Sequence, residues 1–327
     1  MHLSKHSGLF LILLSLFFDV IAQDLPVTFR DDNGKYGLKT ASGTVITPGK
    51  YDYHITGKFN EGKHYIVSFG KYGYINEKGF EIVPPQYIRA GEFSDGVGVV
   101  CMEDKKAMII DDKGKVLQKF SYNYEQTGTK FSNGLMAIVK DNLWGFINKK
   151  GELVVPHQYF QVGHFSEGLA AVYIGGRKLS YSVSDGKWGF INVSGKLVIS
   201  GQFEGVHSSG FSEGLCGVSF EKNGVLATNP KYGFIDTSGK LVISNRYQSV
   251  WAFSNGVAKI VENKNVIGSE STYGLIKKDG SLLFPLIKCY YLEGDGEELK
   301  RKGKLKVLLS LGGQDGYYIN SKGEKVQ

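Results

Sequence analysis

The sequence predicts an all-β fold built from about eight copies of one small unit. The segment Gly145–Pro156 recurs with drift along the chain, and the copies start 35 to 44 residues apart. The composition agrees with short strands and turns, with 44 glycines, 39 Phe plus Tyr and only 4 Met among 327 residues. A repeat of this period indicates an array of stacked units. In every copy a glycine follows the first position by seven residues: Gly43, Gly79, Gly114, Gly151, Gly195, Gly239, Gly280 and Gly323.

The first 22 residues read as a signal peptide that precedes the repeats. Lys5 and His6 come before the apolar run Leu9–Phe18, and Val20–Ala22 offers small or aliphatic residues for cleavage. An uncleaved N-terminal anchor is the alternative. We therefore expect a signal peptide at 1–22 and a single β domain at 23–327, exported to the periplasm, the cell surface or the medium.

Each unit is predicted to contain four short strands. In the fourth unit these are Leu169–Ile174, Trp188–Asn192, Lys196–Ile199 and Phe203–His207, separated by turn residues. The next unit opens at Leu215.

The turn between the second and third strands explains the recurrent glycine. We expect Gly151 to adopt a positive φ, which glycine reaches without a Cβ clash. A short polar side chain at the head of the turn, such as Asn148, is expected to accept a hydrogen bond from the backbone two residues on. We also expect Trp188 to be buried as a wedge between neighbouring units, with Gly189 allowing close approach of a backbone.

A second signature, Phe-Ser-Glu-Gly, precedes the first strand of most units. Its phenylalanine is expected to anchor the turn in the core. The copies are Phe59–Gly62, Phe93–Gly96, Phe131–Gly134, Phe165–Gly168, Phe211–Gly214 and Phe253–Gly256.

Added residues fall at one connection of the unit. Gly175–Gly186, Glu221–Pro230 and Glu262–Thr272 are polar insertions between the first two strands. Insertions at equivalent places share one face of a repeat array, and such a loop-rich face is a candidate for recognition. Neutral drift in tolerated loops explains the same pattern equally well.

These motifs resemble the WG-repeat (KWG-repeat) family of bacterial proteins, over roughly Val27 to Val326. Pro84, Pro156 and Pro285 match the family's proline after the hairpin, whereas Ser200 and Ser244 depart from it. The resemblance implies a β-repeat scaffold with binding roles and supplies no catalytic residues. Four strands in about 40 residues, with a Phe-Ser-x-Gly turn before an apolar strand, favour a β-propeller-like array of about eight four-stranded repeats. Because one unit lacks its Phe-Ser-Glu-Gly strand, an open β-solenoid of stacked hairpins is the alternative.

Several residues belong to types that act in catalysis or metal binding, but their sequence context does not indicate such a site. Ser212 fits Gly-x-Ser-x-Gly, but that motif needs a following helix, and Ser212 lies in a repeated turn. The acidic stretch Glu293–Glu298 lacks the ligand pattern of a calcium loop and is predicted to be the worn turn of the last unit. Five histidines show no metal-ligand spacing, although a ring would bring some together: His54, His64, His157, His164 and His207.

Recurrent acidic residues and cysteines are interpreted as structural. One turn position carries an acidic residue in four copies: Glu61, Asp95, Glu167 and Glu213. A closed ring would place these carboxylates around one surface, and paired carboxylates can perform acid–base hydrolysis. A residue repeated for turn geometry is nevertheless usually structural. The three cysteines are expected to be small buried hydrophobes: Cys101, Cys216 and Cys289. The sequence does not determine whether all three thiols are free of disulfide bonds. The basic run Lys300–Lys302, with Lys304 and Lys306, contributes to a net charge of +7 and is predicted to be a solvated loop and strand edge.

The sequence thus predicts an exported, non-enzymatic scaffold that binds a protein or a glycan through its loop-rich face. We expect a monomer with no catalytic, cofactor-binding or metal-binding residues, no nucleic-acid partner and no membrane span. The alternative is a propeller-type polysaccharide hydrolase or lyase with a shallow central site. The sequence leaves the ligand unidentified.

Overall fold

The computed structural model describes residues 26–55, 59–178, 183–220, 231–263, 270–310 and 315–327. The expected signal peptide lies outside these residues, as does the insertion Glu221–Pro230. No helix in the described part of the chain is both long and apolar enough to cross a membrane.

The chain forms eight small antiparallel sheets in chain order. Sheets 1 to 4 contain the strands β1 (Val27–Arg30), β2 (Tyr36–Lys39) and β3 (Val45–Tyr51); β4 (Lys63–Ser68), β5 (Lys71–Asn76) and β6 (Glu81–Tyr87); β7 (Arg89–Ala90), β8 (Gly98–Cys101), β9 (Lys106–Ile110) and β10 (Val116–Asn123); and β11 (Leu135–Lys140), β12 (Leu143–Asn148) and β13 (Leu153–Tyr159). A 3-10 helix, η1 (Tyr124–Gln126), precedes β11.

The second half of the chain continues the pattern. Sheets 5 to 8 contain β14 (Leu169–Lys178), β15 (Val183–Asn192) and β16 (Leu197–Phe203); β17 (Gly205–Val206), β18 (Leu215–Ser219), β19 (Tyr232–Asp236) and β20 (Leu241–Tyr247); β21 (Ser249–Val250), β22 (Val257–Asn263), β23 (Ser271–Lys277) and β24 (Ile287–Cys289); and β25 (Tyr291–Glu293), β26 (Leu305–Leu308), β27 (Gly316–Ile319) and β28 (Lys325–Val326). One α-helix, α1 (Gly296–Lys302), lies between β25 and β26.

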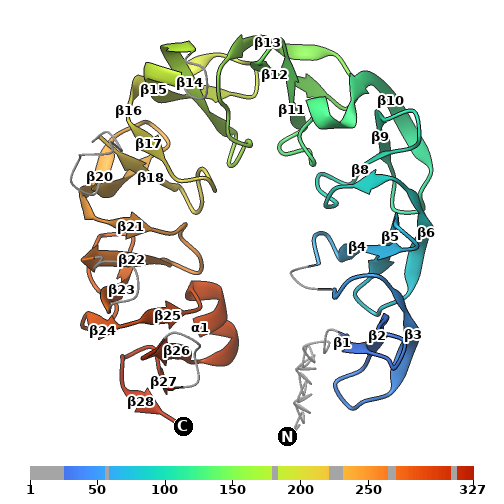
Figure 1. Ribbon diagram of the computed structural model, residues 1–327. Coiled ribbons are helices and arrows are strands. Elements are labelled where there is room, and N and C mark those ends of the chain that lie inside the picture. Colours follow the sequence, from blue (N-terminus) through green and yellow to red (C-terminus); the bar gives the residue numbers. More distant parts are fainter. Residues whose placement is uncertain (1–25, 56–58, 179–182, 221–230, 264–269, 311–314) are drawn as a thin grey trace, which may run out of the picture.

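The sheets stand around a central space in an open arc, with the first and last sheets apart (Figure 1). Each pair of consecutive sheets shares a buried apolar cluster, and none of these clusters in the described chain combines sheet 1 with sheet 8. The all-β, propeller-like prediction is therefore confirmed in its repeating unit, and the described strands form no closed ring.

The assignment of the fourth strand to its own unit was wrong. The short segment β17 leaves the sheet of β16 and pairs with β18 of the next sheet, with Glu204 N–H bonding to Ser219 O at 2.8 Å. In sheets 4 and 5 this inner segment is reduced to single bridges, and sheets 1 and 2 also lack it as a strand, so four of the eight described sheets have three strands. Each connection thus passes from the outer edge of one sheet to the inner edge of the next.

The aromatic of the Trp/Tyr-Gly pair packs between neighbouring units as expected, but mostly at the margin of the core: Trp188 contacts the cluster that sheets 5 and 6 share, and Tyr273 is buried in the cluster of sheets 7 and 8. Trp188 is only partly buried, whereas Phe190, two residues later, is 0% exposed. Residues two apart on a strand point to the same face, and both rings pack on the same buried cluster, Phe190 within it and Trp188 at its margin. The phenylalanine of the Phe-Ser-Glu-Gly turn packs on it, as Phe211 does on Phe190 with ring centroids 5.0 Å apart.

The hairpin glycines confirm their predicted role. All eight have positive φ, between 79° and 97°. Asn148 Oδ1 accepts from Lys150 N–H at 2.9 Å, as expected for the head of the turn. From the second sheet on, each glycine also faces a side chain of the preceding sheet; Gly195, for example, faces Val155.

The last unit departs from the worn turn predicted for Glu293–Glu298. Asp295 caps α1 by accepting from Glu297 N–H and Glu298 N–H, both at 3.0 Å. The basic run Lys300–Lys302 forms the last turn of that helix rather than a loop, where cations complement the helix dipole. Lys302 also pairs with Glu298 at 2.6 Å.

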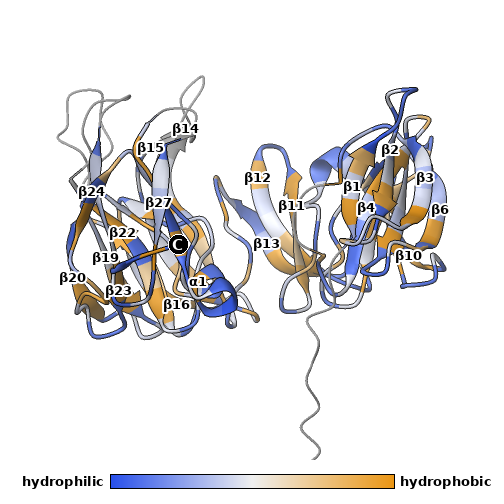
Figure 2. Ribbon diagram, turned by 90° about the horizontal axis from the view of Figure 1, so that it is seen from below, coloured by the Kyte–Doolittle hydropathy of each residue, from blue (hydrophilic) through white to orange (hydrophobic). Residues whose placement is uncertain are grey.

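The long hairpin of β14 and β15 extends beyond the neighbouring strands on one side of the arc (Figure 2). It is the described part of an inserted connection. Because equivalent strands run in the same direction in every sheet, the described strand ends that flank the other insertions lie on this same side. We call this side the loop-bearing face.

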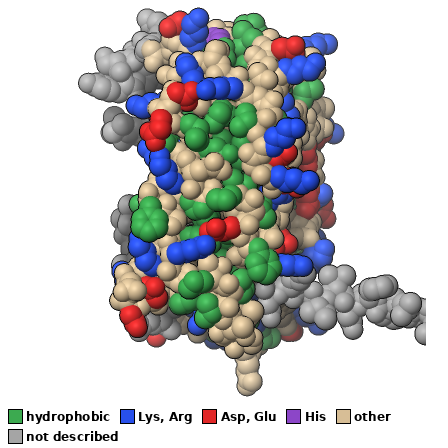
Figure 3. Space-filling view, turned by 90° about the vertical axis from the view of Figure 1, so that its right-hand side faces the viewer, with side chains coloured by type: hydrophobic (Ala, Val, Ile, Leu, Met, Phe, Trp, Pro, Cys, Tyr) green, Lys and Arg blue, Asp and Glu red, His purple; other side chains and the backbone are tan. Residues whose placement is uncertain are grey.

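The outer strands expose an apolar stripe along the rim of sheets 1 to 3 (Figure 3). Val45, Val116 and Leu117 are 47–55% exposed there. Exposed Pro48 and Pro84 lie on the same outer strands. A proline cannot donate to a further strand, and it therefore protects an edge against unwanted pairing.

Candidate functional site

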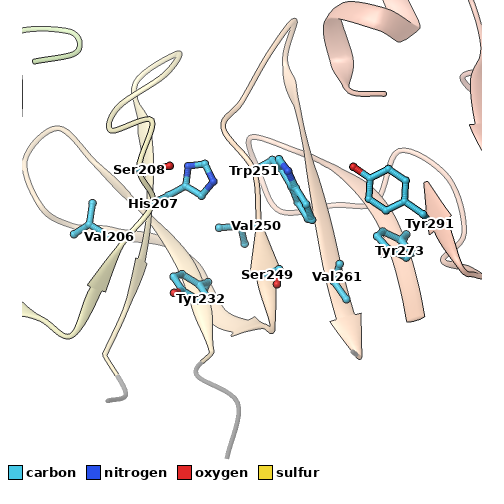
Figure 4. Close-up of a pocket in the computed structure, with 10 residues that line it drawn as sticks. All are labelled: Val206, His207, Ser208, Tyr232, Ser249, Val250, Trp251, Val261, Tyr273 and Tyr291. Atoms are coloured by element: carbon cyan, nitrogen blue, oxygen red, sulfur yellow. The ribbon is translucent and has the colours of Figure 1, made fainter. Parts of the chain in front are cut away.

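A cavity of about 550 Å³ lies on the inner side of sheets 6, 7 and 8. Aromatic side chains from three sheets line it: Tyr232, Trp251, Tyr273 and Tyr291 (Figure 4). Tyr232 and Tyr273 stand near the starts of β19 and β23, where the connections of the loop-bearing face end. The cavity therefore opens at the junction of the inner wall and that face.

A second cavity of about 320 Å³ adjoins the first, since Val206, His207 and Ser208 line both. Its other wall includes His164 and Trp188. We call the two cavities together the inner trough; it runs along the arc from sheet 5 to sheet 8.

Two further cavities lie along sheets 1 to 5, with volumes of about 180 and 380 Å³. They share Tyr65 and Tyr72, and the larger one reaches His164 of the inner trough. The aromatic of the Trp/Tyr-Gly pair thus lines several of these hollows while it also packs against the core.

A buried lysine stands behind the wall of the inner trough. Lys259, on β22, is 4% exposed, and its Nζ lies 4.4 Å from the ring centroid of Trp251 and 4.7 Å from that of Tyr291. The ammonium donates to Tyr291 Oη at 3.1 Å and to Leu292 O at 3.2 Å. Cation–π contacts of this kind stabilise a desolvated ammonium.

The five predicted histidines separate into different places. His164 and His207 line the smaller cavity of the inner trough together, and His54 and His64 line a hollow in sheets 1 and 2. His157 lies apart from them, and its Nε2 is buried without a hydrogen-bond partner among the described residues. No group of three potential ligands for a metal occurs in the described chain.

Burial sets the protonation of three of these rings. Desolvation lowers the pKa of His207, and it lowers the pKa of His164 with help from the nearby charge of Lys130. The pKa of His157 is lowered by burial and then by Lys140. Neutral imidazoles, able to donate and accept, therefore line the inner trough near pH 7.

The recurrent carboxylates connect neighbouring turns instead of forming a catalytic pair. Glu167 Oε2 accepts from Gly214 N–H at 2.9 Å, and Glu213 Oε2 accepts from Gly256 N–H at 3.0 Å. The same bond joins Glu61 to Gly96, Asp95 to Gly134 and Asn133 to Gly168. We call this series the turn ladder.

Ser212 belongs to the turn ladder as well. Its Oγ donates to Phe253 O of the next turn at 2.8 Å. The strand β18 follows directly, so the strand–turn–helix context of a nucleophile elbow does not occur here.

The three cysteines are buried and free. Desolvation raises the pKa of Cys216 to about 12 and that of Cys289 to about 11. A thiol with a raised pKa is a poor nucleophile at neutral pH, which agrees with the role of small buried hydrophobes.

Sequence reasoning missed Trp251, Lys259 and Tyr291. Trp251 lies outside every Trp-Gly pair, whereas Trp144 and Trp188 belong to one. Lys259 interrupts an apolar strand at a position where equivalent units carry Ala137, Ala171 or Gly217. A departure from the repeat was therefore the sequence signal that could have identified these residues as part of a site.

Comparison with known proteins supports the repeat and the fold. The model of the WG containing repeat matches residues 72–105, 144–177, 188–223 and 232–265. No curated protein matches the chain. A crystal structure of the eukaryotic initiation factor shows 11% identity, with a TM-score of 0.50 over 93% of this chain and 96% of that one.

Two other solved structures show weaker similarity. BamB from Moraxella catarrhalis is 10% identical, with a TM-score of 0.41 over 88% of this chain and 94% of that one. Kluyveromyces lactis Hsv2p is 14% identical, with a TM-score of 0.39 over 72% and 75%.

The matched segments begin at Tyr72, Trp144, Trp188 and Tyr232, the aromatic residues that open four of the repeats. Each of these residues starts or lies in the middle strand of a described sheet. Four repeats of this chain thus match the WG containing repeat.

Proposed function

We propose that this protein is an exported, non-enzymatic scaffold that binds a glycan in the inner trough. The observation that carries the proposal is the larger cavity, whose walls combine four aromatic rings with the polar side chains of His207 and Ser208. The C–H face of a sugar ring is slightly positive and packs on the negative face of an aromatic ring. A concave site of several hundred Å³ suits a few sugar units.

Export rests on the sequence of residues 1–22, with a basic start followed by an apolar run. An extracytoplasmic scaffold would meet glycans of an envelope or a matrix. The loop-bearing face, where the trough opens, is the face for which recognition was expected.

The alternative of a hydrolase or lyase finds little support in this site. None of the residues that line the larger cavity is Asp or Glu. The carboxylates considered for acid–base chemistry accept backbone bonds in the turn ladder. Glycoside hydrolysis by the usual route requires two carboxyl groups that flank the bond.

A glycan array with the mature chain tests the proposal, together with turnover assays on any glycan that is retained. We expect capture without cleavage, and an affinity at least about tenfold lower for Trp251→Ala, because the largest aromatic face is lost. Trp144→Ala is the matched control, since Trp144 lies in sheet 4, outside the inner trough. Equal binding by Trp251→Ala and the parent, or cleavage of the captured glycan, would contradict the proposal.

A protein ligand is a second candidate, and exposed aromatic residues favour it. Phe69 is 87% exposed in the tight turn between β4 and β5, and Tyr53 is 67% exposed nearby on the same face. Large exposed aromatics often anchor protein partners. Capture of one defined protein that is lost with Phe69→Ser, and is unaffected by Trp251→Ala, would favour this candidate over the glycan.

A further inference from the structure

We infer that the glycan is acidic, with a uronate carboxylate that approaches the Tyr291 hydroxyl over the buried ammonium of Lys259. The inference rests on the proposed function and specifies the chemistry of its ligand. Three observations support it: the cation without a carboxylate partner beside a wall without acidic residues, the hydrogen bonds of the Tyr291 hydroxyl, and the other polar groups of the cavity.

The first observation concerns charge. Lys259 Nζ is held between two aromatic faces, and in the described chain it forms no ion pair with Asp or Glu. A buried charge without a carboxylate partner is weakly screened, so its field extends into the adjoining cavity. No Asp or Glu lines that cavity to oppose it.

The second observation concerns the tyrosine hydroxyl. Tyr291 Oη accepts from the Lys259 ammonium at 3.1 Å, so its own proton is free to point elsewhere. An O–H group that accepts from a cation is polarised and becomes a stronger donor. Tyr291 lines the cavity, and a carboxylate oxygen placed there would complete a chain from the ammonium through the hydroxyl to the ligand.

The third observation concerns the other polar groups of the cavity. The indole N–H of Trp251 is only a donor, and the neutral ring of His207 and the hydroxyl of Ser208 can donate as well. The indole of Trp251 thus contributes a donor-only group, beside side chains that can donate or accept, around the aromatic faces that Figure 4 shows. A ligand rich in acceptors, with a negative charge and an apolar ring face, matches this arrangement; a uronic acid unit has all three properties.

Isothermal titration with matched pairs of oligosaccharides tests the inference on the mature full chain. The probes are oligogalacturonate and oligomannuronate, each compared with its carboxyl-reduced, neutral counterpart. We expect the acidic member of at least one pair to bind about ten- to a hundredfold more tightly, as for a hydrogen bond to a charged group. Added salt should narrow the difference.

Variants locate the source of the preference. Lys259→Met keeps the length of the side chain and removes the ammonium, and it should abolish the preference for the acidic member of each pair. Tyr291→Phe removes only the hydroxyl and should reduce the preference by a smaller factor. Lys288→Met is the matched control, because Lys288 is on the same sheet with a side chain that is 67% exposed. If Lys259→Met fails to fold, Tyr291→Phe alone decides the result.

The outcomes separate this inference from the proposed function. Equal binding of an acidic oligosaccharide and its reduced counterpart overturns the inference and leaves the glycan scaffold in place. A preference that survives both Lys259→Met and Tyr291→Phe also overturns it. Binding of neither member of either pair, with tight binding of hexaglutamate that Trp251→Ala removes, overturns both and assigns the trough to acidic peptides.

Discussion

At the scale of single residues, the glycine of the Trp/Tyr-Gly pair shapes the sheet that contains it. The pairing register shifts between Trp188 and Phe190, where the outer strand β16 bulges. A Cβ at Gly189 would lie 2.5 Å from Ile199 O, and Gly73, Gly145 and Gly233 face an equivalent carbonyl. The glycine is therefore required by close approach within one sheet.

Substitution of Gly189 tests this requirement. We expect Gly189→Ala to reduce the free energy of unfolding by about 1–3 kcal/mol or more, because the backbone carbonyl of Ile199 cannot move away without loss of pairing. Gly163→Ala is the control, since the nearest atom to its Cβ would be 3.6 Å away. Urea unfolding measures both; equal stabilities would contradict the account.

The inner-wall histidines predict how stability depends on pH. Burial lowers the pKa of His207 below 6.5, so the unfolded chain binds a proton more readily than the folded one. Stability should be level above pH 6.5 and should fall as the pH drops from 6.5 through the folded pKa. His207→Asn should make this decline shallower in urea unfolding at pH 7.5, 6.5 and 5.5, with a residual slope from His157 and His164. An unchanged slope would mean that His207 titrates alike in both states.

At the scale of elements, the turn ladder joins consecutive sheets near their inner edges. The acidic residue of each turn adopts a positive φ, such as 50° for Glu167 and 54° for Glu213, which directs its side chain to the following turn. For Glu213, burial alone would raise the pKa, but bonds from Gly256 and Lys278 outweigh it and hold the pKa below its usual value. The ladder thus adds directional bonds to apolar packing between sheets.

Removal of one rung should weaken the ladder locally. We expect Glu167→Ala to cost about 0.5–1.5 kcal/mol, because Gly214 N–H loses its acceptor. Glu167→Gln retains an oxygen acceptor and should cost less. Glu103→Ala is the control, because Glu103 makes only an exposed ion pair with Lys71, and such pairs contribute little. Thermal unfolding that ranks Glu103→Ala as the most damaging would refute the ladder.

Repeat signatures predicted these elements well where local geometry decides. The positive φ of Gly151 and the bond to Asn148 follow from a four-residue turn, and both were predicted. The pairing of β17 with β18 depends instead on contacts between units, which one unit's sequence does not contain. The capped helix α1 replaced the predicted turn, since Asp295 can cap two N–H groups and a basic last turn follows.

The inner trough followed the opposite rule. Trp188 and Tyr232 repeat faithfully, and repetition suggested the core; they pack at its margin and also line the inner trough, while the Phe two residues later takes the fully buried position. Trp251 and Lys259 break the repeat and form the distinctive part of the site. Deviations from the repeat carried more functional information than the repeat itself.

At the scale of the whole molecule, the arc is held by contacts between neighbours. Consecutive sheets share apolar clusters, so an interior sheet is stabilised from both sides and a terminal sheet from one. In such one-dimensional arrays stability is approximately a sum of unit and interface terms. The ends should therefore open more readily than the middle.

Hydrogen exchange measured by mass spectrometry tests this gradient. We expect amides of β2 to exchange faster than those of β12, although both are middle strands of three-stranded sheets. The physical reason is that sheet 1, in the described chain, shares a buried cluster only with sheet 2, so fewer contacts oppose its local opening. Uniform protection from sheet 1 to sheet 8 would indicate a closed, globally cooperative ring.

Gly43 in the first hairpin has open space before it, whereas its seven equivalents each face the preceding sheet. In a closed circle the angle between blades dictates how many can fit, and adding one would force all the others to adjust. Here, tandem duplication of a unit could lengthen the chain while leaving every existing contact intact. The number of repeats, and with it the length of the inner wall, is thus free to vary during evolution.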